Sequence, residues 1–366
     1  MRLKIVYLIS VLLIYSCSNN TRKHEINYKI VRELVLPDST NSLYLIENQS
    51  FNSSDSSYIF VFQQFENRKI YSLKVKENEI YCNETSIRAD HFFFSMFLQT
   101  MDSIYSFDNN TNELILSNGH GIQLNKYRID DSITPIVNPS YRLIANSTNL
   151  LLGNASKSID FGSYTGRLNY YRTVKPVASL SLLRDELLCK GIGRFPDEYV
   201  KTGNNYYDVA PSVCITDNGF ICLSFGADDH LYLYKDTTLV LSKNVKSNYI
   251  SDFSAIPDDK RFDMLYLKKY ISEEPRYLNI IYDPFNKMFY RIVKHRLING
   301  LKPGDRFWSV IVLDNDLNVI GETKFSYQFE PSVFLPTPYG IMLLRKKNSE
   351  MENSAFVLIK MEFDEK

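Results

Sequence analysis

Short apolar segments recur along the whole chain, and each is closed by a cluster of Asp, Asn, Gly or Ser residues. They are rich in aromatic and β-branched side chains, as in residues 58–62, 92–98, 221–225 and 277–282. Such segments are typical of β-strands. Sustained helical periodicity is rare, and its best example, residues 177–190, also fits a pair of strands. The pattern therefore predicts an all-β fold: a sandwich, a barrel or a propeller.

A faint internal repeat favours the propeller. Each copy is a strand, a polar turn containing Asp and a second strand, and the Asp fits because its carboxylate accepts turn N–H groups. Copies begin at Ile104, Leu231, Leu278 and Val310, and looser ones cover residues 58–75, 158–174 and 355–363. Seven units of about 50 residues match the spacing of propeller blades. We expect a seven-bladed β-propeller. Six or eight blades fit the spacing almost as well, and two β-sandwich domains are the alternative fold.

The two ends of the predicted domain both read as strands. Residues 26–31 alternate between apolar and polar positions, and residues 354–363 end the chain on a further strand. Propellers commonly close by pairing a terminal strand with the last blade, which removes an exposed sheet edge. We expect this closure, within a single domain that spans residues 26–366.

The N-terminus carries the features of a lipoprotein signal peptide. Arg2 and Lys4 precede an apolar run over residues 5–14, which is shorter than the ~20 residues of a membrane-spanning helix. Residues 14–17 then resemble the lipoprotein box of bacteria. We expect residues 1–16 to be removed, Cys17 to be acylated and residues 17–25 to form a polar tether. Cleavage elsewhere, with Cys17 incidental, is the alternative.

Composition narrows the class of partner. Lys and Arg number 42, as do Asp and Glu, and this balance argues against a nucleic-acid partner. The chain holds 26 Tyr and 23 Phe but one Trp, which suits pleated surfaces. Beyond Cys17, the cysteines are Cys82, Cys189, Cys214 and Cys222; none forms a CxxC pair, and their disulfide state stays open.

Known catalytic and cofactor motifs are missing from the sequence. The five histidines lack metal-ligand spacing, and there is no Walker A sequence and no GxSxG elbow. The glycines of residues 191–196 are followed by Pro196 in place of the third glycine of a dinucleotide site. The sequence therefore assigns no catalytic residue, metal or cofactor.

Four segments resemble a family of uncharacterised propeller-like lipoproteins, a domain of unknown function, from Gram-negative bacteria of the gut type. They are residues 191–199, 224–234, 282–291 and 310–323. The resemblance implies β-architecture and lipid anchoring in the outer membrane. Because no acidic cluster follows Cys17, we favour the periplasmic side over the cell surface. The resemblance supplies no catalytic residues.

Four short Asp-Ser or Asp-Thr segments resemble an O-glycosylation acceptor of exported proteins in such bacteria. The acceptor residues would be Ser39, Ser103, Ser132 and Thr237. Ordinary turn chemistry is the alternative interpretation.

The leading functional hypothesis is a non-catalytic envelope lipoprotein that binds a protein or a glycan. Its candidate contacts lie in two loops and are Asp197, Tyr199, Tyr206, Tyr207, Asp228, Asp229 and His230. Packing between blades is the alternative for each tyrosine. One rival is a hydrolase of glycans or phosphoesters that uses these acids, Glu198 and His230. Another is an accessory subunit of an outer-membrane transport or sensing system.

Overall fold

The computed structural model of the chain describes most of residues 24–363. The described ranges are 24–36, 43–52, 57–64, 69–77, 79–84, 96–100, 103–108, 111–118, 120–129, 134–135, 144–145, 149–155, 161–183, 186–207, 209–298, 302, 306–347 and 353–363. The predicted signal peptide and Cys17 lie outside these ranges. Among the helices inside them, none combines the length and the apolar character needed to cross a bilayer.

The described strands form six sheets, and the first three follow one another along the chain. The first holds β3 (Leu43–Asn52), β4 (Ser57–Gln64), β5 (Lys69–Val75) and β6 (Ile80–Glu84). The second holds β7 (Met96–Thr100), β8 (Ser103–Asp108), β9 (Glu113–Ser117) and β10 (Gln123–Arg128). The third holds β11 (Thr134–Pro135), β12 (Ile144–Ala145), β13 (Asn149–Ala155), β14 (Val177–Leu183) and β15 (Glu186–Ile192).

The remaining three sheets include the two N-terminal strands. The fourth holds β16 (Ser212–Ile215), β17 (Phe220–Ser224), β18 (His230–Lys235) and β19 (Thr238–Asn244). The fifth holds β20 (Arg276–Asp283), β21 (Met288–Lys294), β22 (Trp308–Leu313), β23 (Val319–Phe325) and β1 (His24–Glu25). The sixth holds β24 (Phe329–Thr337), β25 (Gly340–Arg345), β26 (Ala355–Glu362) and β2 (Asn27–Val35).

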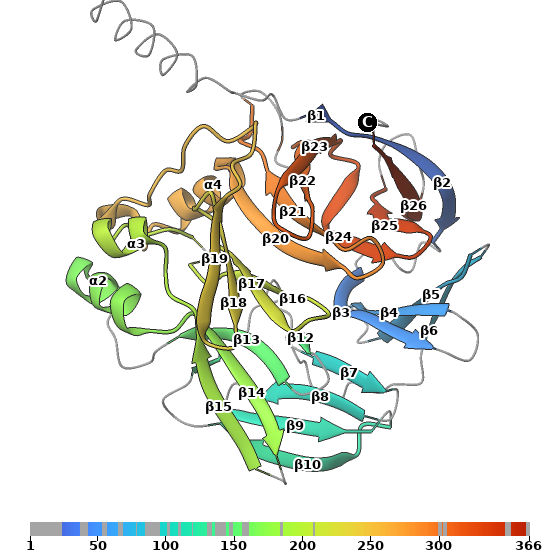
Figure 1. The fold of residues 1–366 in the computed structure, drawn as a ribbon, viewed down its shortest axis with the longest axis horizontal. Helices are drawn as coiled ribbons and strands as arrows, with labels where there is room; N and C mark the ends of the chain where they lie inside the picture. The colour runs from blue at the N-terminus through green and yellow to red at the C-terminus, as the bar shows by residue number, and fades with distance from the viewer. Residues whose placement is uncertain are drawn as a thin grey trace, which may run out of the picture.

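Neighbouring sheets contact one another in a closed cycle. Strand β3 contacts β7, β10 contacts β15, β12 contacts β16, β16 contacts β20, β20 contacts β24, and β24 returns to β3. Figure 1 shows the sheets following one another around the molecule. The predicted pairing of the chain ends is confirmed, because β2 runs antiparallel to β26 from Asn27 opposite Glu362 to Val35 opposite Ala355. Strand β1 adds a second N-terminal contact, parallel to β23.

The described residues form six sheets where the sequence suggests seven repeat units. Two of the predicted hairpins, which begin at Leu278 and Val310, are β20–β21 and β22–β23 of one sheet. The assignment of residues 158–174 to a hairpin is wrong, because residues 164–173 form helix α2 (Tyr164–Thr173). Residues 177–190 lie in the β14–β15 hairpin, so the strand-pair interpretation of that segment is correct.

The predicted role of Asp in the turns is confirmed at two of them. Asp283 Oδ1 accepts the backbone N–H groups of Phe285 at 2.8 Å and Asn286 at 3.1 Å. Asp314 Oδ1 accepts those of Asp316 at 2.9 Å and Asn318 at 2.7 Å. Both carboxylates satisfy turn donors that the sheet leaves unpaired, which explains why the motif recurs.

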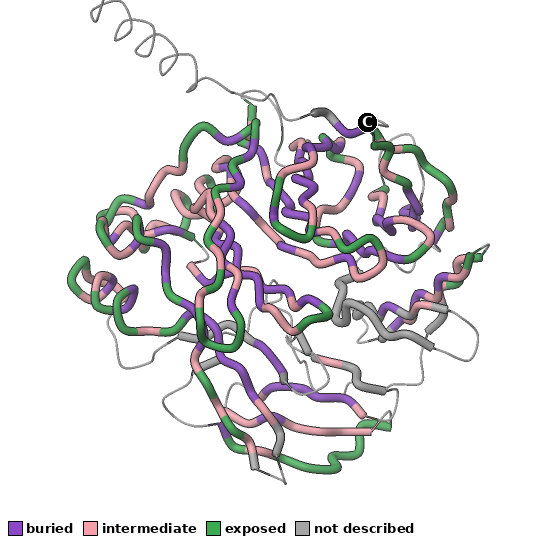
Figure 2. The backbone as a smooth tube through the Cα atoms, viewed as in Figure 1, coloured by how far each residue is buried: buried purple, intermediate pink, exposed green. Residues whose placement is uncertain are grey.

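The core lies between the faces of neighbouring sheets. Aromatic rings fill the junction of the fifth and sixth sheets, where Trp308 stacks on Phe325 at 4.4 Å and Tyr290 lies 5.1 Å from Phe334. Every residue of β22 is buried. Figure 2 shows the same pattern, with buried strands inside and exposed connections outside. Much of the aromatic excess therefore packs sheet against sheet.

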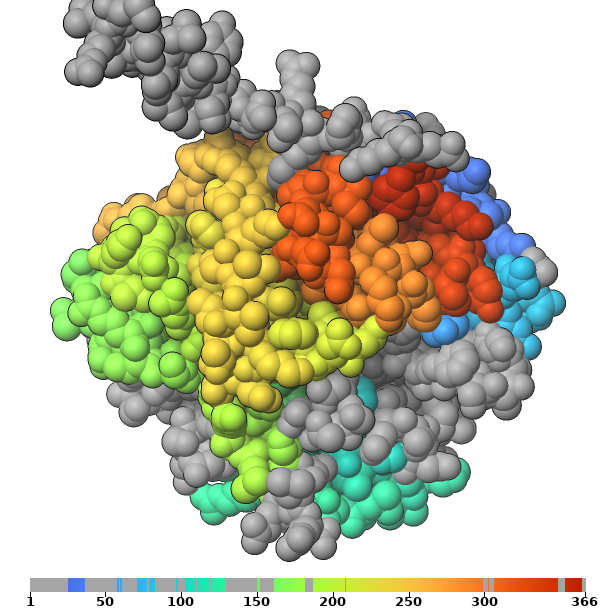
Figure 3. Space-filling view, viewed as in Figure 1, coloured from blue at the N-terminus to red at the C-terminus, as the bar shows by residue number. Residues whose placement is uncertain are grey.

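Among the described residues, three short helices lie in connections: one within the third sheet, one between the third and fourth sheets and one between the fourth and fifth. They are α2, α3 (Asp197–Thr202) and α4 (Met264–Glu273), with a 3₁₀ turn η2 (Asp258–Lys260) before α4. Buried Arg167 of α2 donates from Nε to Gly203 O at 2.9 Å and from Nη2 to Asp258 Oδ1 at 2.5 Å. This side chain ties α2 to the end of α3 and to η2. In Figure 3 the yellow surface of the fourth sheet separates the green region that carries α2 and α3 from the orange and red sheets.

Candidate functional site

The turn between β17 and β18 carries the acid and histidine cluster that the sequence singles out. Asp228 Oδ1 lies 3.1 Å from His230 Nδ1, and Asp228 Oδ2 accepts the hydroxyl hydrogen of Tyr232 at 2.7 Å. Asp229 Oδ1 accepts the hydroxyl hydrogen of Tyr277 at 2.6 Å. Asp228 and Asp229 are thus engaged by different groups, so they do not form a facing carboxylate pair.

A buried arginine fixes the backbone of this turn. Arg291 is fully buried and donates to the carbonyl oxygens of Asp228 at 2.6 Å, Asp229 at 2.9 Å and Val245 at 2.9 Å. Its Nε donates to Ser224 Oγ at 3.0 Å. Burial lowers the pKa of Arg291, although the nearby aspartates oppose this. The turn is therefore held rigidly by a satisfied polar network, which fits the structural role expected for a strand end.

The candidate contacts near α3 divide into buried and exposed residues. Tyr199 is fully buried, stacks on Tyr206 at 4.7 Å and accepts the N–H of Ala227 at 3.2 Å. Desolvation by burial raises the pKa of Tyr199. Tyr199 packs in the core, as in the alternative interpretation, and Tyr206 is buried but also lines one pocket. Asp197 is exposed in the first turn of α3.

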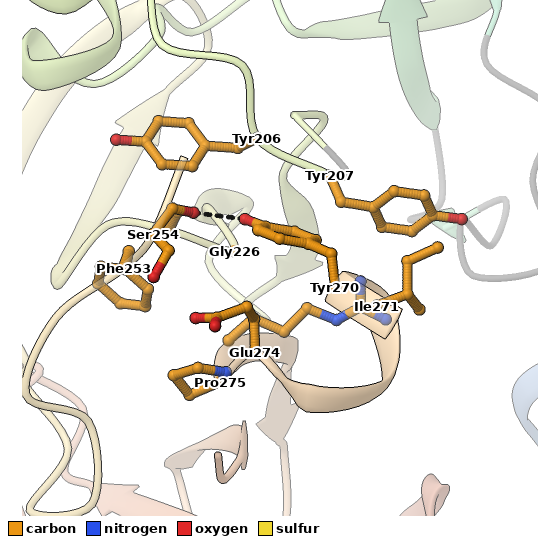
Figure 4. Close-up of a pocket in the computed structure, with 11 residues that line it drawn as sticks. Tyr206, Tyr207, Gly226, Phe253, Ser254, Tyr270, Ile271, Glu274 and Pro275 are labelled. Carbon is orange, nitrogen blue, oxygen red and sulfur yellow. Dashed lines mark hydrogen bonds between the residues drawn. The ribbon is translucent and has the colours of Figure 1, made fainter. Parts of the chain in front are cut away.

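A pocket opens beside these loops and encloses about 320 Å³, including its open mouth. Four segments build it: residues 206–207, 226–227, 253–254 and 270–276. Figure 4 shows the rings of Tyr206, Tyr207 and Tyr270 around it, with the carboxylate of Glu274 below. The hydroxyl of Tyr270 donates to Ser254 O at 2.5 Å, and burial raises its pKa. The pocket therefore combines aromatic faces with fixed polar groups.

One wall of the pocket is charged. The guanidinium of Arg276 lies over the ring of Tyr207, 5.3 Å from its centroid, and Tyr207 is 38% exposed. Glu274 Oε1 accepts from Arg296 at 2.9 Å, whereas Glu274 Oε2 is buried and has no hydrogen-bond partner among the described residues. A buried acceptor without a donor lowers the stability of the fold. A ligand that donates a hydrogen bond to this oxygen would therefore gain binding free energy.

A second arginine stands behind this wall. Arg306 Nε and Nη2 are buried and have no hydrogen-bond partner within the described part of the chain. Burial, followed by the charge of Arg276, lowers the pKa of Arg306 to about 10, and Glu273 and Glu274 act in the opposite direction. Unsatisfied donors and an unsatisfied acceptor thus lie in one electrostatic environment. Arg306 is not among the residues that line the pocket, so the pocket itself offers a ligand the Glu274 acceptor and the guanidinium of Arg276.

Sequence reasoning finds Tyr206 and Tyr207 but misses the other pocket residues. Phe253, Tyr270, Glu274 and Arg276 lie in or after the long connection between β19 and β20. Two features of the sequence could have pointed to these residues. The strand pattern is interrupted between residues 245 and 275, and Tyr266 and Tyr270 lie one helical turn apart within that interruption. Long connections in β folds often carry function.

The other predicted sites lie on turns or outside the described residues. Thr237 is exposed in the β18–β19 turn and Ser103 begins β8, whereas Cys17, Ser39 and Ser132 fall outside the described ranges. Cys82, Cys189, Cys214 and Cys222 form no disulfide within the described part of the chain, although Cys214 lies directly opposite Cys222 across β16 and β17. Within the described ranges, no group of three or more His, Cys, Asp or Glu residues is placed to hold a metal.

Comparison with known proteins supplies a family and no activity. The model of the domain of unknown function DUF4221 matches residues 91–324. A DUF4221 family member from Bacteroides vulgatus superposes with a TM-score of 0.70 at 16% identity, covering 93% of this chain and 100% of that one. A Bacteroides fragilis protein predicted to be exported gives a TM-score of 0.49 at 10% identity, covering 92% and 95%. No curated protein sequence matches this chain at a significant level.

The fold likeness and the family match agree with each other. The sequence therefore resembles an uncharacterised family of gut-type bacteria, as expected. Because the family model matches well over half of the chain, the protein belongs to the DUF4221 family.

Proposed function

We propose that this protein is an exported, non-catalytic binding protein, anchored to the outer membrane through acylated Cys17. The six sheets would be the blades of a β-propeller that begins at His24 rather than at residue 26, because β1 belongs to the fifth sheet. The cyclic contacts between sheets and the pairing of β2 with β26 support this architecture. The apolar run before Cys17 supports export and anchoring, with the periplasmic side favoured.

Of the two partner classes, the pocket favours a glycan. Tyrosine rings offer flat apolar faces on which a sugar ring can stack. Glu274 Oε2 is a buried acceptor without a donor among the described residues, and Arg276, which also lines the pocket, supplies donors. Sugar hydroxyl groups donate and accept at once, so they can satisfy both. The unsatisfied Glu274 Oε2, in a pocket that exposed Tyr207 also lines, carries this proposal.

The hydrolase hypothesis has less support from the geometry. A hydrolytic acid and base need carboxyl groups that face the same substrate atom in different environments. Asp228 is instead engaged by Tyr232 and His230, and Asp229 by Tyr277. These contacts support a structural role for the turn.

A glycan array probed with the full acylated chain in detergent tests the proposal. We expect binding to oligosaccharides, weakened about tenfold or more by Tyr207→Ala or Arg276→Ala, because both remove pocket contacts. Tyr164→Ala is the matched control, since Tyr164 is 50% exposed on α2 outside the pocket. Equal binding by the wild type and all three variants would show that the pocket is not the glycan-binding site. Release of free sugar that stops with Asp228→Asn would favour the hydrolase.

A further inference from the structure

Three neighbouring apolar side chains protrude from the start of α4. Phe262 is 78% exposed, Met264 64% and Leu265 80%, which makes them the most exposed large hydrophobic side chains among the described residues. We call these three residues the α4 knob. Isolated exposed apolar residues are common, but a contiguous group marks a surface that contacts a protein or a membrane.

The base of the α4 knob is held in place. Asp263 caps the helix, and its Oδ1 accepts the N–H groups of Leu265 at 3.1 Å and Tyr266 at 3.0 Å. In the preceding turn, Asp263 N–H donates to Lys260 O at 3.0 Å. Buried Arg167 holds Asp258 in the same turn. The fold therefore presents the three apolar side chains to solvent on a fixed support.

Charged residues of both signs flank the α4 knob. Lys260 and Arg261 precede it, and Lys268 and Lys269 follow one turn later on α4. The Arg261 guanidinium lies 4.7 Å from the centre of the Phe262 ring. Of the nearby acids, Asp258 is paired with Arg167, whereas Asp263 lies 3.8 Å from Lys260 and Glu273 lies 4.0 Å from Lys269. Asp259 is exposed, so Arg261 and Lys268 are the basic side chains on which contact with anionic headgroups rests. Long basic side chains beside exposed apolar ones are suited to the boundary between acyl chains and anionic headgroups.

The size and position of the α4 knob favour a membrane over a protein. A stable protein interface buries ~800 Å² on each partner, usually over a broad surface, whereas the knob is three protruding side chains. Strand β20 follows α4 directly, and β1 lies at the other edge of the same five-stranded sheet. That sheet is about 19 Å wide. The α4 knob lies up to ~15 Å beyond β20, at the far end of ten-residue α4. The chain from Cys17 to His24 can reach about 25 Å, so anchor and knob can touch one bilayer when the sheet lies inclined to its surface.

We propose that the α4 knob inserts into the interfacial region of the membrane that carries the acylated Cys17. This inference rests on the proposed lipid anchor and adds a second contact. One anchor leaves a tethered protein free to rotate, whereas two contacts fix its orientation. The second contact would hold α4, and with it the pocket wall formed by Tyr270 and Glu274, close to the headgroups.

Tryptophan fluorescence can test this insertion because the chain has a single tryptophan. Trp308 is 2% exposed, so it serves as a buried internal reference. The acylated full chain carrying Phe262→Trp is reconstituted into vesicles of phosphatidylethanolamine and phosphatidylglycerol, with plain or brominated acyl chains. Leu124→Trp is the matched control, since Leu124 is 55% exposed on β10, on the far side of the molecule from α4 in Figure 1.

We expect brominated lipid to quench the indole at position 262 at least about threefold more than the one at position 124. Adding Leu265→Ser to Phe262→Trp should reduce that quenching, because it removes part of the apolar contact. Equal quenching at positions 262 and 124 would overturn the proposal. So would a blue shift at position 262 without quenching, which indicates burial against protein. Flotation of the wild-type chain with vesicles reports on the Cys17 anchor separately.

Discussion

The guanidinium of Arg291 lies over the ring of Tyr277, with its central carbon 3.3 Å from the ring centroid. The Tyr277 hydroxyl donates to Asp229 Oδ1 at 2.6 Å and accepts the N–H of Ser247 at 3.0 Å. These two side chains join β20 and β21 of the fifth sheet to the connections around the fourth. The junction of the two sheets is therefore a polar network enclosed by apolar packing.

Replacing Arg291 should strongly destabilise this junction. Arg291→Met removes the Arg291 donors from the carbonyl oxygens of Asp228 and Val245, and leaves that of Asp229 with the N–H of Val245 alone. We expect the free energy of unfolding to fall by about 3 kcal/mol, as measured by urea denaturation. Arg296→Met is the control: Arg296 is 44% exposed in its ion pairs, so a change below about 1 kcal/mol is expected. Similar losses of unfolding free energy in Arg291→Met and Arg296→Met would show that the buried network stabilises the fold no more than a surface ion pair does.

His295 should make stability depend on pH. It is buried, stacks on Tyr249 at 4.3 Å and lies 2.8 Å from Ser309 Oγ through Nε2. Burial, and then the charge of Lys324, lowers the pKa of His295 to about 4, whereas the unfolded chain has a value near 6.5. Protons thus bind the unfolded state more readily, so the contribution of His295 is present above pH 6.5 and is lost as pH falls toward 4.

Urea denaturation at pH 7 and pH 5 measures this effect. Between these values the wild type should lose about 2 kcal/mol more than His295→Gln, which cannot titrate. Glu322 is buried beside Ser309 and accepts its hydroxyl hydrogen at 2.6 Å. It remains in both proteins, so the difference isolates the imidazole. Equal losses of stability in the wild type and His295→Gln would show that His295 does not cause the pH dependence.

The four described cysteines should remain thiols in the mature protein. Cys214 and Cys222 are buried, and burial raises the pKa of Cys82 to about 11. A raised pKa leaves little thiolate at pH 8, so we expect slow alkylation of Cys82 in the folded protein. After denaturation without reductant, mass spectrometry should find four alkylated cysteines and an acylated Cys17. Two alkylated cysteines would instead reveal a disulfide.

The turn between β24 and β25 should require glycine. Gly340 has φ of +142°, and a Cβ there would lie 2.3 Å from the carbonyl oxygen of Ile359 on β26. We expect Gly340→Ala to lower the free energy of unfolding by about 2 kcal/mol or more. At Gly219, φ is +73° and an added Cβ meets only Lys235 Nζ at 3.6 Å. Gly219→Ala should cost about 1 kcal/mol, and thermal unfolding of both variants checks the difference.

The positions of strands and turns could be predicted from the sequence because they depend on residues that are close together in the chain. The apolar segments at residues 58–62 and 221–225 lie in β4 and β17, and Asp283 and Asp314 bind the turns in which they lie. Helix α2 could not be predicted in this way. Its sequence has no apolar stripe, and it buries Arg167 and two tyrosines through contacts with residues distant in the chain.

The sequence by itself determined the β-rich architecture, because alternation of side chains and turn chemistry act over a few residues. The closing strand pair was expected from the way propellers close, and the family from the resemblance of four segments. Only the tertiary structure decided that two repeat units share the fifth sheet and that Tyr199 is core. It also decided that residues 206–207, 226–227, 253–254 and 270–276 form one pocket. These outcomes depend on which segments meet after folding, and burial at such contacts is a property of the assembled sheets, which no local pattern encodes.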